Sequence, residues 1–192
     1  MRSFMSRIQK VSSYLLAIFN FLLIVLPLFS LSIWLFMDVE PIKSLIAEGL
    51  LFSPVETPEG TINISTIKWT HLSKFTSFMA ILIGLLPLLA GLFVLKAVFR
   101  NYQKGEIFNA YNARHYRYLG WIFFLDAFIA EPLSHALMVL AVTLSNPPGH
   151  RIISITFGSP NIEALFCGIL VIVISWIMVE GYKLQEEQKL II

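Results

Sequence analysis

The sequence has little charge and a single cysteine, and each shortage excludes a class of protein. Charged residues make up 14% of the 192 positions, against about 25% in a typical soluble domain. The net charge is only +2, which excludes the strongly basic surface by which proteins bind nucleic acid. The lone cysteine, Cys167, excludes an intramolecular disulfide and any zinc or iron–sulfur site that needs several cysteines.

What the sequence has in excess is apolar residues, which make up 57% of the chain. A soluble chain of this size could not bury so much apolar surface, whereas lipid can cover it. Four runs reach the roughly 20 residues that cross a bilayer, at about 11–37, 75–99, 118–144 and 162–182. We therefore predict an all-α membrane protein, a single domain over residues 1–192 folded as a four-transmembrane-helix bundle.

The basic residues predict how these spans are oriented. Ten of the fourteen Lys and Arg residues lie in the N-terminal tail, in the 100–117 connection with its edges, and in the C-terminal tail. Because cytoplasmic segments are enriched in Lys and Arg, we expect both termini in the cytoplasm. The loops 38–74 and 145–161 then face outward.

Both outward loops contain a stretch that alternates polar and apolar residues and is rich in β-branched ones. These stretches lie at 61–65 and around 151–157, and such alternation between Gly or Pro residues is typical of strands. Because both loops lie on the same side of the membrane, we expect loops 1 and 3 to form a small extracytoplasmic β-element together.

The 100–117 connection has signals of a tight turn. Gly105 is expected to end the second long helix in the left-handed conformation, and Asn109 to cap the next helix. Ile107 and Phe108 can lie in the membrane surface. The segment is interpreted either as a turn that anchors the chain at the interface or as a ligand-binding loop.

Two arginines follow this turn. Arg114 and Arg117 lie at the start of the third span, where their guanidinium groups can reach lipid phosphates. We therefore expect membrane lipids among the partners of the chain.

The same segment resembles the bacterial domain-of-unknown-function 2975 family. The resemblance rests on a Tyr-x-x-Gly-x-Ile-Phe turn, a following Asn, and a Gly that opens the third helix: Tyr102, Gly105, Ile107, Phe108, Asn112 and Gly120. Gly181 and the stretch 184–187 agree with it, whereas residues 189–192 depart from the family's usual ending. The resemblance implies a multi-pass protein of the bacterial inner membrane, with no established activity and no catalytic residues to transfer.

The third span differs from the others because it carries Asp126, Glu131 and His135. A carboxylate at the bilayer centre costs about 2.5–3.5 kcal/mol on insertion scales, so such residues are functional candidates. Glu131 and His135 are four residues apart and share a helix face, whereas Asp126 points elsewhere. The pair is interpreted as a polar clamp to another helix (through Asn20, Ser175 or a carbonyl group at a helix kink), as a proton or ion relay, or as a metal or small-ligand site.

No motif in the sequence identifies a reaction. Two ligands on one helix are too few for a metal site, so we expect neither a metal nor another cofactor. The preferred hypothesis is a non-enzymatic membrane interaction or regulatory protein, which binds a membrane-protein partner or forms a homo-oligomer. The alternatives are a transporter or channel-like protein with a proton, ion or amphiphile site on the third helix, and a membrane enzyme acting on a lipid or quinone.

Overall fold

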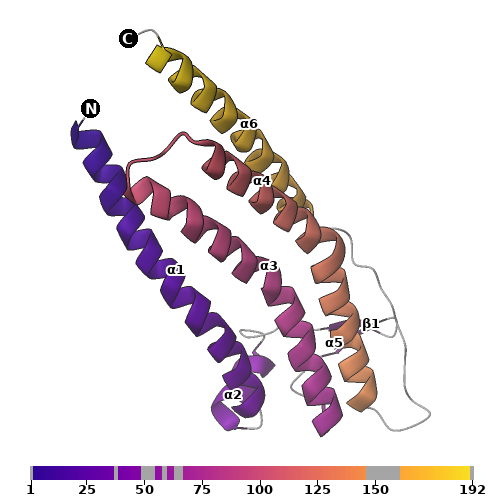
Figure 1. The fold of residues 1–192 in the computed structure, drawn as a ribbon. Helices are drawn as coiled ribbons and strands as arrows, with labels where there is room; N and C mark the ends of the chain where they lie inside the picture. The colour runs from indigo at the N-terminus through magenta and orange to yellow at the C-terminus, as the bar shows by residue number, and fades with distance from the viewer. Residues whose placement is uncertain are drawn as a thin grey trace. The chain divides into compact units, whose positions relative to one another are not determined.

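The computed structural model describes residues 2–36, 39–48, 55–57, 60–62, 67–145 and 161–190 (Figure 1). These residues form, in chain order, the following elements: α1 (Arg2–Phe36), α2 (Glu40–Ala47), β1 (Val55–Thr57), β2 (Gly60–Ile62), α3 (His71–Gln103), α4 (Ala110–Leu125), the π-helical turn η2 (Asp126–Ala130), α5 (Glu131–Ser145) and α6 (Ile162–Leu190).

Within the described ranges, four helical segments are long and apolar enough to cross a membrane. They are Ser6–Phe36, His71–Gln103, Ala110–Ser145 and Ile162–Gln188, the third being α4, η2 and α5 in succession. Most residues in the apolar window of each segment are not buried inside the protein, so lipid is the natural cover for this surface. The predicted all-helical fold with four membrane-length helices is confirmed.

The β-element differs from the prediction. β1 pairs antiparallel with β2, with Val55 opposite Ile62, so both strands belong to the same predicted loop, 38–74. Residues 63–65 and 151–157, the rest of the expected strands, lie outside the described residues. The predicted pairing between loops 1 and 3 is therefore not supported. Strands separated by two residues pair locally because closing so short a loop costs little entropy.

The chain divides into two compact units. The first comprises Met1–Ile24, Pro87–Ala127 and Asn161–Ile192, and the second comprises Val25–Leu86 and Phe128–Pro160. The helices α1 and α3 contribute residues to both units, and η2 contains the boundary between them.

In the first unit, α4 packs closely against α6. A Cβ atom added to Gly120 would lie 3.1 Å from the carbonyl oxygen of Gly168 and 2.5 Å from Cγ1 of Ile172. Small residues let helix backbones approach in this way, and such approach is a main source of helix–helix attraction in membranes. Ser175 adds a buried hydrogen bond, donated by Oγ to the carbonyl oxygen of Ala113 at 2.7 Å.

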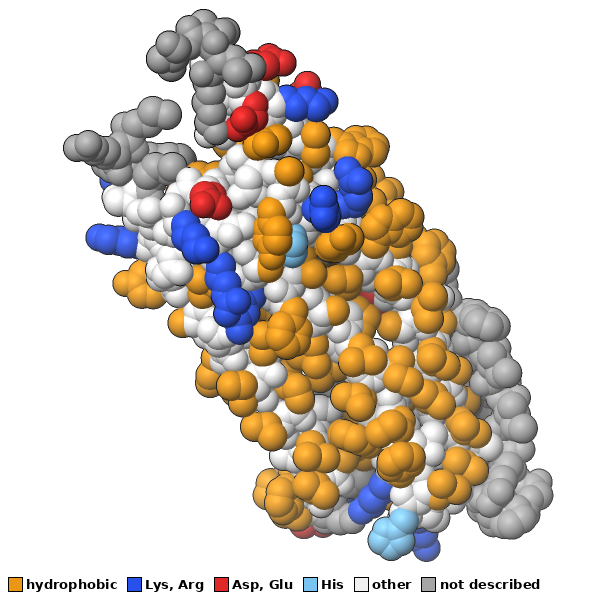
Figure 2. All heavy atoms as spheres, viewed as in Figure 1, with side chains coloured by type: hydrophobic (Ala, Val, Ile, Leu, Met, Phe, Trp, Pro, Cys, Tyr) orange, Lys and Arg blue, Asp and Glu red, His pale blue; other side chains and the backbone are white. Residues whose placement is uncertain are grey.

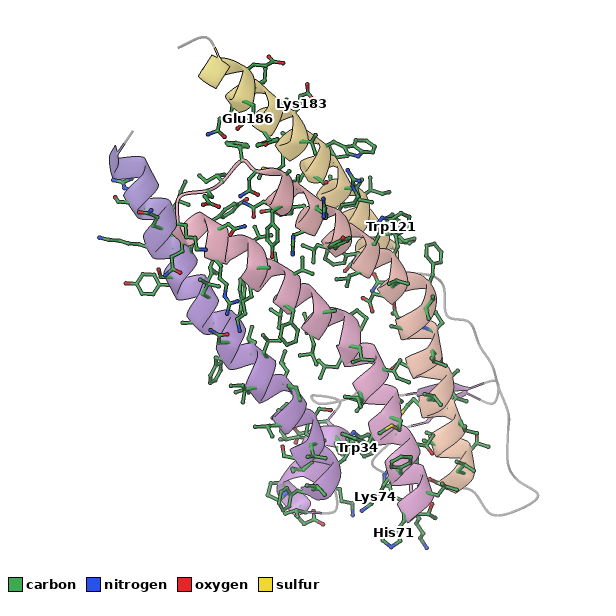
Figure 3. All side chains as sticks on the ribbon, in the orientation of Figure 1. Trp34, His71, Lys74, Trp121, Lys183 and Glu186 are labelled. Atoms are coloured by element: carbon green, nitrogen blue, oxygen red, sulfur yellow. The ribbon has the colours of Figure 1, made fainter. Side chains whose placement is uncertain are left out.

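In the second unit, a buried cluster joins α1, α2 and α5. Its members are Trp34, Ile46, Val139 and Val142. Trp34 points from α1 toward α3 (Figure 3) and meets Trp69 edge-to-face, with the ring centroids 5.3 Å apart. The cluster therefore ties the short helix α2 to membrane-length helices.

Candidate functional site

The turn between α3 and α4, residues 101–112, has the local geometry that the sequence predicts. Gly105 has a φ of 85°, which is the left-handed conformation expected at a helix end. The side chain of Asn109 accepts a hydrogen bond from the backbone N–H of Asn112 at 2.6 Å and so caps α4. Both predictions, the terminator and the cap, are confirmed.

A fully buried side chain, that of Asn112, holds this turn closed. Its Nδ2 donates to the carbonyl oxygens of Glu106 at 2.8 Å and Ile107 at 2.9 Å. Its Oδ1 accepts from Nδ2 of Asn101 at 2.8 Å. Three of the four hydrogen-bonding positions of the amide are thereby used inside the protein. Asn112 therefore positions the turn. Both the oxygen and the nitrogen of its side-chain amide are hydrogen-bonded inside the protein, which compensates for their burial.

Two further contacts attach the turn to its surroundings in the first unit. The hydroxyl groups of Tyr102 and Tyr116 are 2.9 Å apart and share a hydrogen bond. The ring of Phe108 covers Gly181, where an added Cβ would lie 2.8 Å from Cδ1 of the ring. The glycine in α6 therefore makes room for the aromatic ring from the turn. Together these contacts favour the anchored-turn interpretation over a loose ligand-binding loop.

A pocket of about 190 Å³ opens beside the turn, between α4 and α6. It is lined by Ala110, Ala113, Arg114, Arg117, Val179 and Tyr182. Both arginines are exposed, and neither has an ion-pair partner among the residues that the structure describes. Figure 2 shows basic side chains over α4 and α6 with hydrophobic side chains around them. The pocket thus offers two uncompensated guanidinium groups beside an apolar wall.

An aromatic stripe runs along α4 next to these arginines. The ring of His115 lies 4.0 Å from that of Tyr111 and 5.8 Å from that of Tyr118, measured between centroids. Tyr111, Tyr118 and Trp121 are about half exposed, and Trp121 points outward from α4 (Figure 3). Tyrosine and tryptophan are enriched where a membrane meets water, so this stripe has the composition of an interfacial surface.

The three ionisable residues of the third span fall in different places. Asp126 is the first residue of η2 and belongs to the first unit, whereas Glu131 and His135 lie in α5 and belong to the second. Among the described residues, no hydrogen bond or ion pair joins Glu131 to His135 or to any other side chain. Ser175, one of the partners expected for a polar clamp, donates to Ala113 instead.

Glu131 lies on an uncovered turn of α5. Its side chain is exposed, and so are three neighbours in the sequence, Phe128, Ile129 and Leu133, at 58%, 56% and 45% of full exposure. His135 is half-buried one turn later. The residue after His135 on the same face, Met138, packs on the buried cluster of the second unit. This face of α5 is therefore covered by other residues of the protein at Met138 and exposed at Glu131.

The backbone changes its hydrogen bonding just before this turn. Asp126–Ala130 form a π-helical turn, and Pro132 lies two residues after its end. In a regular α-helix the proline ring would clash with the carbonyl group four residues earlier, that of Phe128. A wider π turn at that position gives the ring room. Short π-helical turns are frequent at functional sites.

Among the described residues, no group of three or more His, Cys, Asp or Glu side chains could hold a metal ion. Sequence reasoning missed the Asn101–Asn112 hydrogen bond and the buried Ser175–Ala113 contact. The sequence signal for these two contacts was a polar residue, Asn112 or Ser175, among small and apolar neighbours in its helix.

Comparison with known proteins places the chain in a family. The family model described as a protein of unknown function (DUF2975) matches residues 11–192, nearly the whole chain. No curated protein and no solved structure matches the chain.

Proposed function

We propose that this chain, which belongs to the family of proteins of unknown function DUF2975, is a non-enzymatic membrane interaction protein that self-associates through its third helix. In this proposal it is a multi-pass protein of the bacterial inner membrane with both termini in the cytoplasm. The occupant of the exposed turn at Glu131 is a second copy of the same chain.

The observation that carries the proposal is the exposed carboxyl group of Glu131. The residue lies about 20 Å along the helix from Tyr118, at about 1.5 Å per residue, which is near the middle of the apolar run. A carboxylate at that depth costs about 2.5–3.5 kcal/mol on insertion scales, and such residues commonly face another protein segment or a water-filled cavity. Since no described residue pairs with Glu131, a contact from another molecule would lower that cost.

Hydrogen-bonding complementarity favours a second copy as the partner. Identical chains insert in the same orientation, so their third helices run parallel and place equivalent residues at the same depth. His135, one helical turn from Glu131, is then available to the Glu131 of the other copy as a hydrogen-bond donor. Interhelical hydrogen bonds of this kind are a recognised source of association in membranes.

The test is self-association in lipid. Energy transfer between donor- and acceptor-labelled copies in liposomes is expected to report a dimer for the wild-type chain. Glu131→Leu removes the carboxyl group and is expected to weaken association roughly five- to thirtyfold, as the loss of about 1–2 kcal/mol of interhelical hydrogen bonding would. Glu131→Gln, which keeps a hydrogen-bonding group, is expected to weaken it less.

The matched control is Glu163→Gln, which alters an exposed carboxyl group in the first turn of α6, away from the middle of a span. It is expected to leave association unchanged. A wild-type chain that stays monomeric at every protein-to-lipid ratio would contradict the proposal. So would a Glu131→Leu variant that associates as strongly as the wild type.

A second candidate is a proton or ion site at the same residues. The π-helical turn Asp126–Ala130 favours it, because such turns are frequent at functional sites. The same variants separate the two proposals. In liposomes loaded with a pH-sensitive dye, a relay predicts proton flux above that of empty liposomes and its loss in Glu131→Gln. Self-association alone predicts wild-type flux equal to that of empty liposomes.

A further inference from the structure

We infer that the pocket between α4 and α6 binds the phosphate group of an anionic membrane lipid through Arg114 and Arg117. This site lies in the first unit and is independent of the proposed self-association at Glu131. Its ligand class follows from the charge of the pocket, its size and the residues that border it.

The charge of the pocket is positive and uncompensated. Arg114 and Arg117 both line it, both are exposed, and neither is paired with a carboxylate among the described residues. Glu180 follows the lining residue Val179, but its carboxylate is already paired with Lys183, Nζ to Oε2, at 3.1 Å. The planar guanidinium group matches the geometry of a phosphate, to which it can donate two parallel hydrogen bonds.

The size of the pocket fits a headgroup and not a whole amphiphile. Its volume is about 190 Å³, whereas pockets that enclose drug-sized molecules have volumes of roughly 300–1,000 Å³. The rest of the wall comes from Ala110, Ala113, Val179 and Tyr182. These side chains offer apolar surface and one phenolic hydroxyl group, so among the described lining residues only the arginines are charged.

The aromatic stripe on α4 identifies the membrane as the source of the phosphate. Tyr111, Tyr118 and Trp121 lie exposed along the helix that carries the two arginines. Such rings prefer the depth at which headgroups meet acyl chains. At that depth the arginines lie at the level of the lipid phosphates. A phosphate ion free in solution shares the same chemistry and is the alternative source.

Native mass spectrometry of the full chain tests the site. Protein released from nanodiscs of phosphatidylcholine mixed with phosphatidylglycerol is expected to retain phosphatidylglycerol. The double variant Arg114→Gln/Arg117→Gln is expected to bind it roughly thirtyfold more weakly, from about 1 kcal/mol per basic residue near an anionic surface. The matched control is Arg7→Gln/Arg100→Gln, which removes two exposed arginines that do not line the pocket and is expected to retain the lipid.

A second variant changes the pocket without changing its charge. Ala110→Leu places a larger side chain at an exposed lining position and is expected to reduce lipid retention while both arginines remain. This variant keeps the test decisive if the double arginine variant folds poorly.

The source of the phosphate is decided by a parallel calorimetric titration with inorganic phosphate in neutral detergent. Phosphatidylglycerol retention that depends on Arg114 and Arg117, with no binding of inorganic phosphate, establishes a lipid site. Inorganic phosphate binding with the same dependence, and no preference for phosphatidylglycerol, overturns the lipid assignment. Lipid retention that is equal in the wild type, the double variant and the control overturns the site.

Discussion

At the scale of single residues, polar side chains in this protein fall into two groups. Asn112 and Ser175 are fully buried and hydrogen-bonded to backbone carbonyl groups, so their role is to hold segments together. Arg114, Arg117 and Glu131 are exposed and unpaired among the described residues. The first group stabilises the first unit, and the second is where an interaction with lipid or protein would occur.

The role of Asn112 can be tested by truncation. Asn112→Ala would leave the carbonyl groups of Glu106 and Ile107 and the amide of Asn101 without this partner. An unsatisfied buried polar group costs about 1–3 kcal/mol, so thermal unfolding of the detergent-purified chain should occur at a lower temperature. Asn20→Ala, at an exposed position of α1, is the control and should unfold with the wild type. Equal midpoints for all three proteins would show that the amide does not hold the turn.

At the scale of elements, two helix features determine what the sites can do. The close approach of α4 and α6 at Gly120 and Gly168 positions the two helices that line the pocket of Arg114 and Arg117. The π-helical turn Asp126–Ala130 interrupts the third span and precedes Glu131 and Pro132. The arginine residues of the pocket therefore lie on a closely packed α-helix. Glu131, by contrast, directly follows a turn in which the α-helical hydrogen bonding is interrupted.

Glycine-to-alanine substitutions can test the close approach. In Gly120→Ala the new Cβ would lie 2.5 Å from Cγ1 of Ile172 and 3.1 Å from the backbone oxygen of Gly168, so the Ile172 side chain or the α6 backbone must shift. Overpacking of this kind costs about 1–3 kcal/mol. In the control Gly91→Ala the new atom would meet only the end of the Leu119 side chain, at 3.3 Å. Thermal unfolding should therefore distinguish the two variants, and equal stability would argue against tight backbone packing at Gly120.

At the scale of the whole molecule, the four membrane-length helices among the described residues leave most of their apolar residues unburied by the protein itself. The two units each have their own buried groups: the α4–α6 contact with Ser175 in the first, and the cluster around Trp34 and Val139 in the second. Both proposed contacts, with lipid phosphate and with a second copy, belong to this scale because they involve molecules outside the chain.

The proposed orientation makes a prediction for the intact protein in a bacterial membrane. Because most Lys and Arg residues lie at the termini and near the 100–117 connection, both ends should remain in the cytoplasm. A fluorescent protein fused to the C-terminus should then fluoresce, and alkaline phosphatase at the same position should be inactive, because it needs the disulfides that form outside the cytoplasm. Fusions to a chain truncated after Ser145 should give the opposite result. Phosphatase activity at the C-terminus would reverse the orientation.

The sequence by itself determined the long-range pattern of this protein. Runs of apolar residues predicted four membrane-length helices, because a backbone in lipid must satisfy its own hydrogen bonds within a helix. Gly105 and Asn109 predicted the end of α3 and the cap of α4, because these signals act through neighbouring residues alone.

Only the tertiary structure decided which residues meet across helices. The two described strands, β1 and β2, pair within one loop, because closing a short loop costs little entropy. Ser175 bonds to Ala113 and not to the ionisable residues of the third span. The exposure of Glu131, and the pocket that places Arg114 and Arg117 beside Val179 and Tyr182, depend on contacts between segments far apart in the chain. Periodicity along one helix carries no information about such contacts.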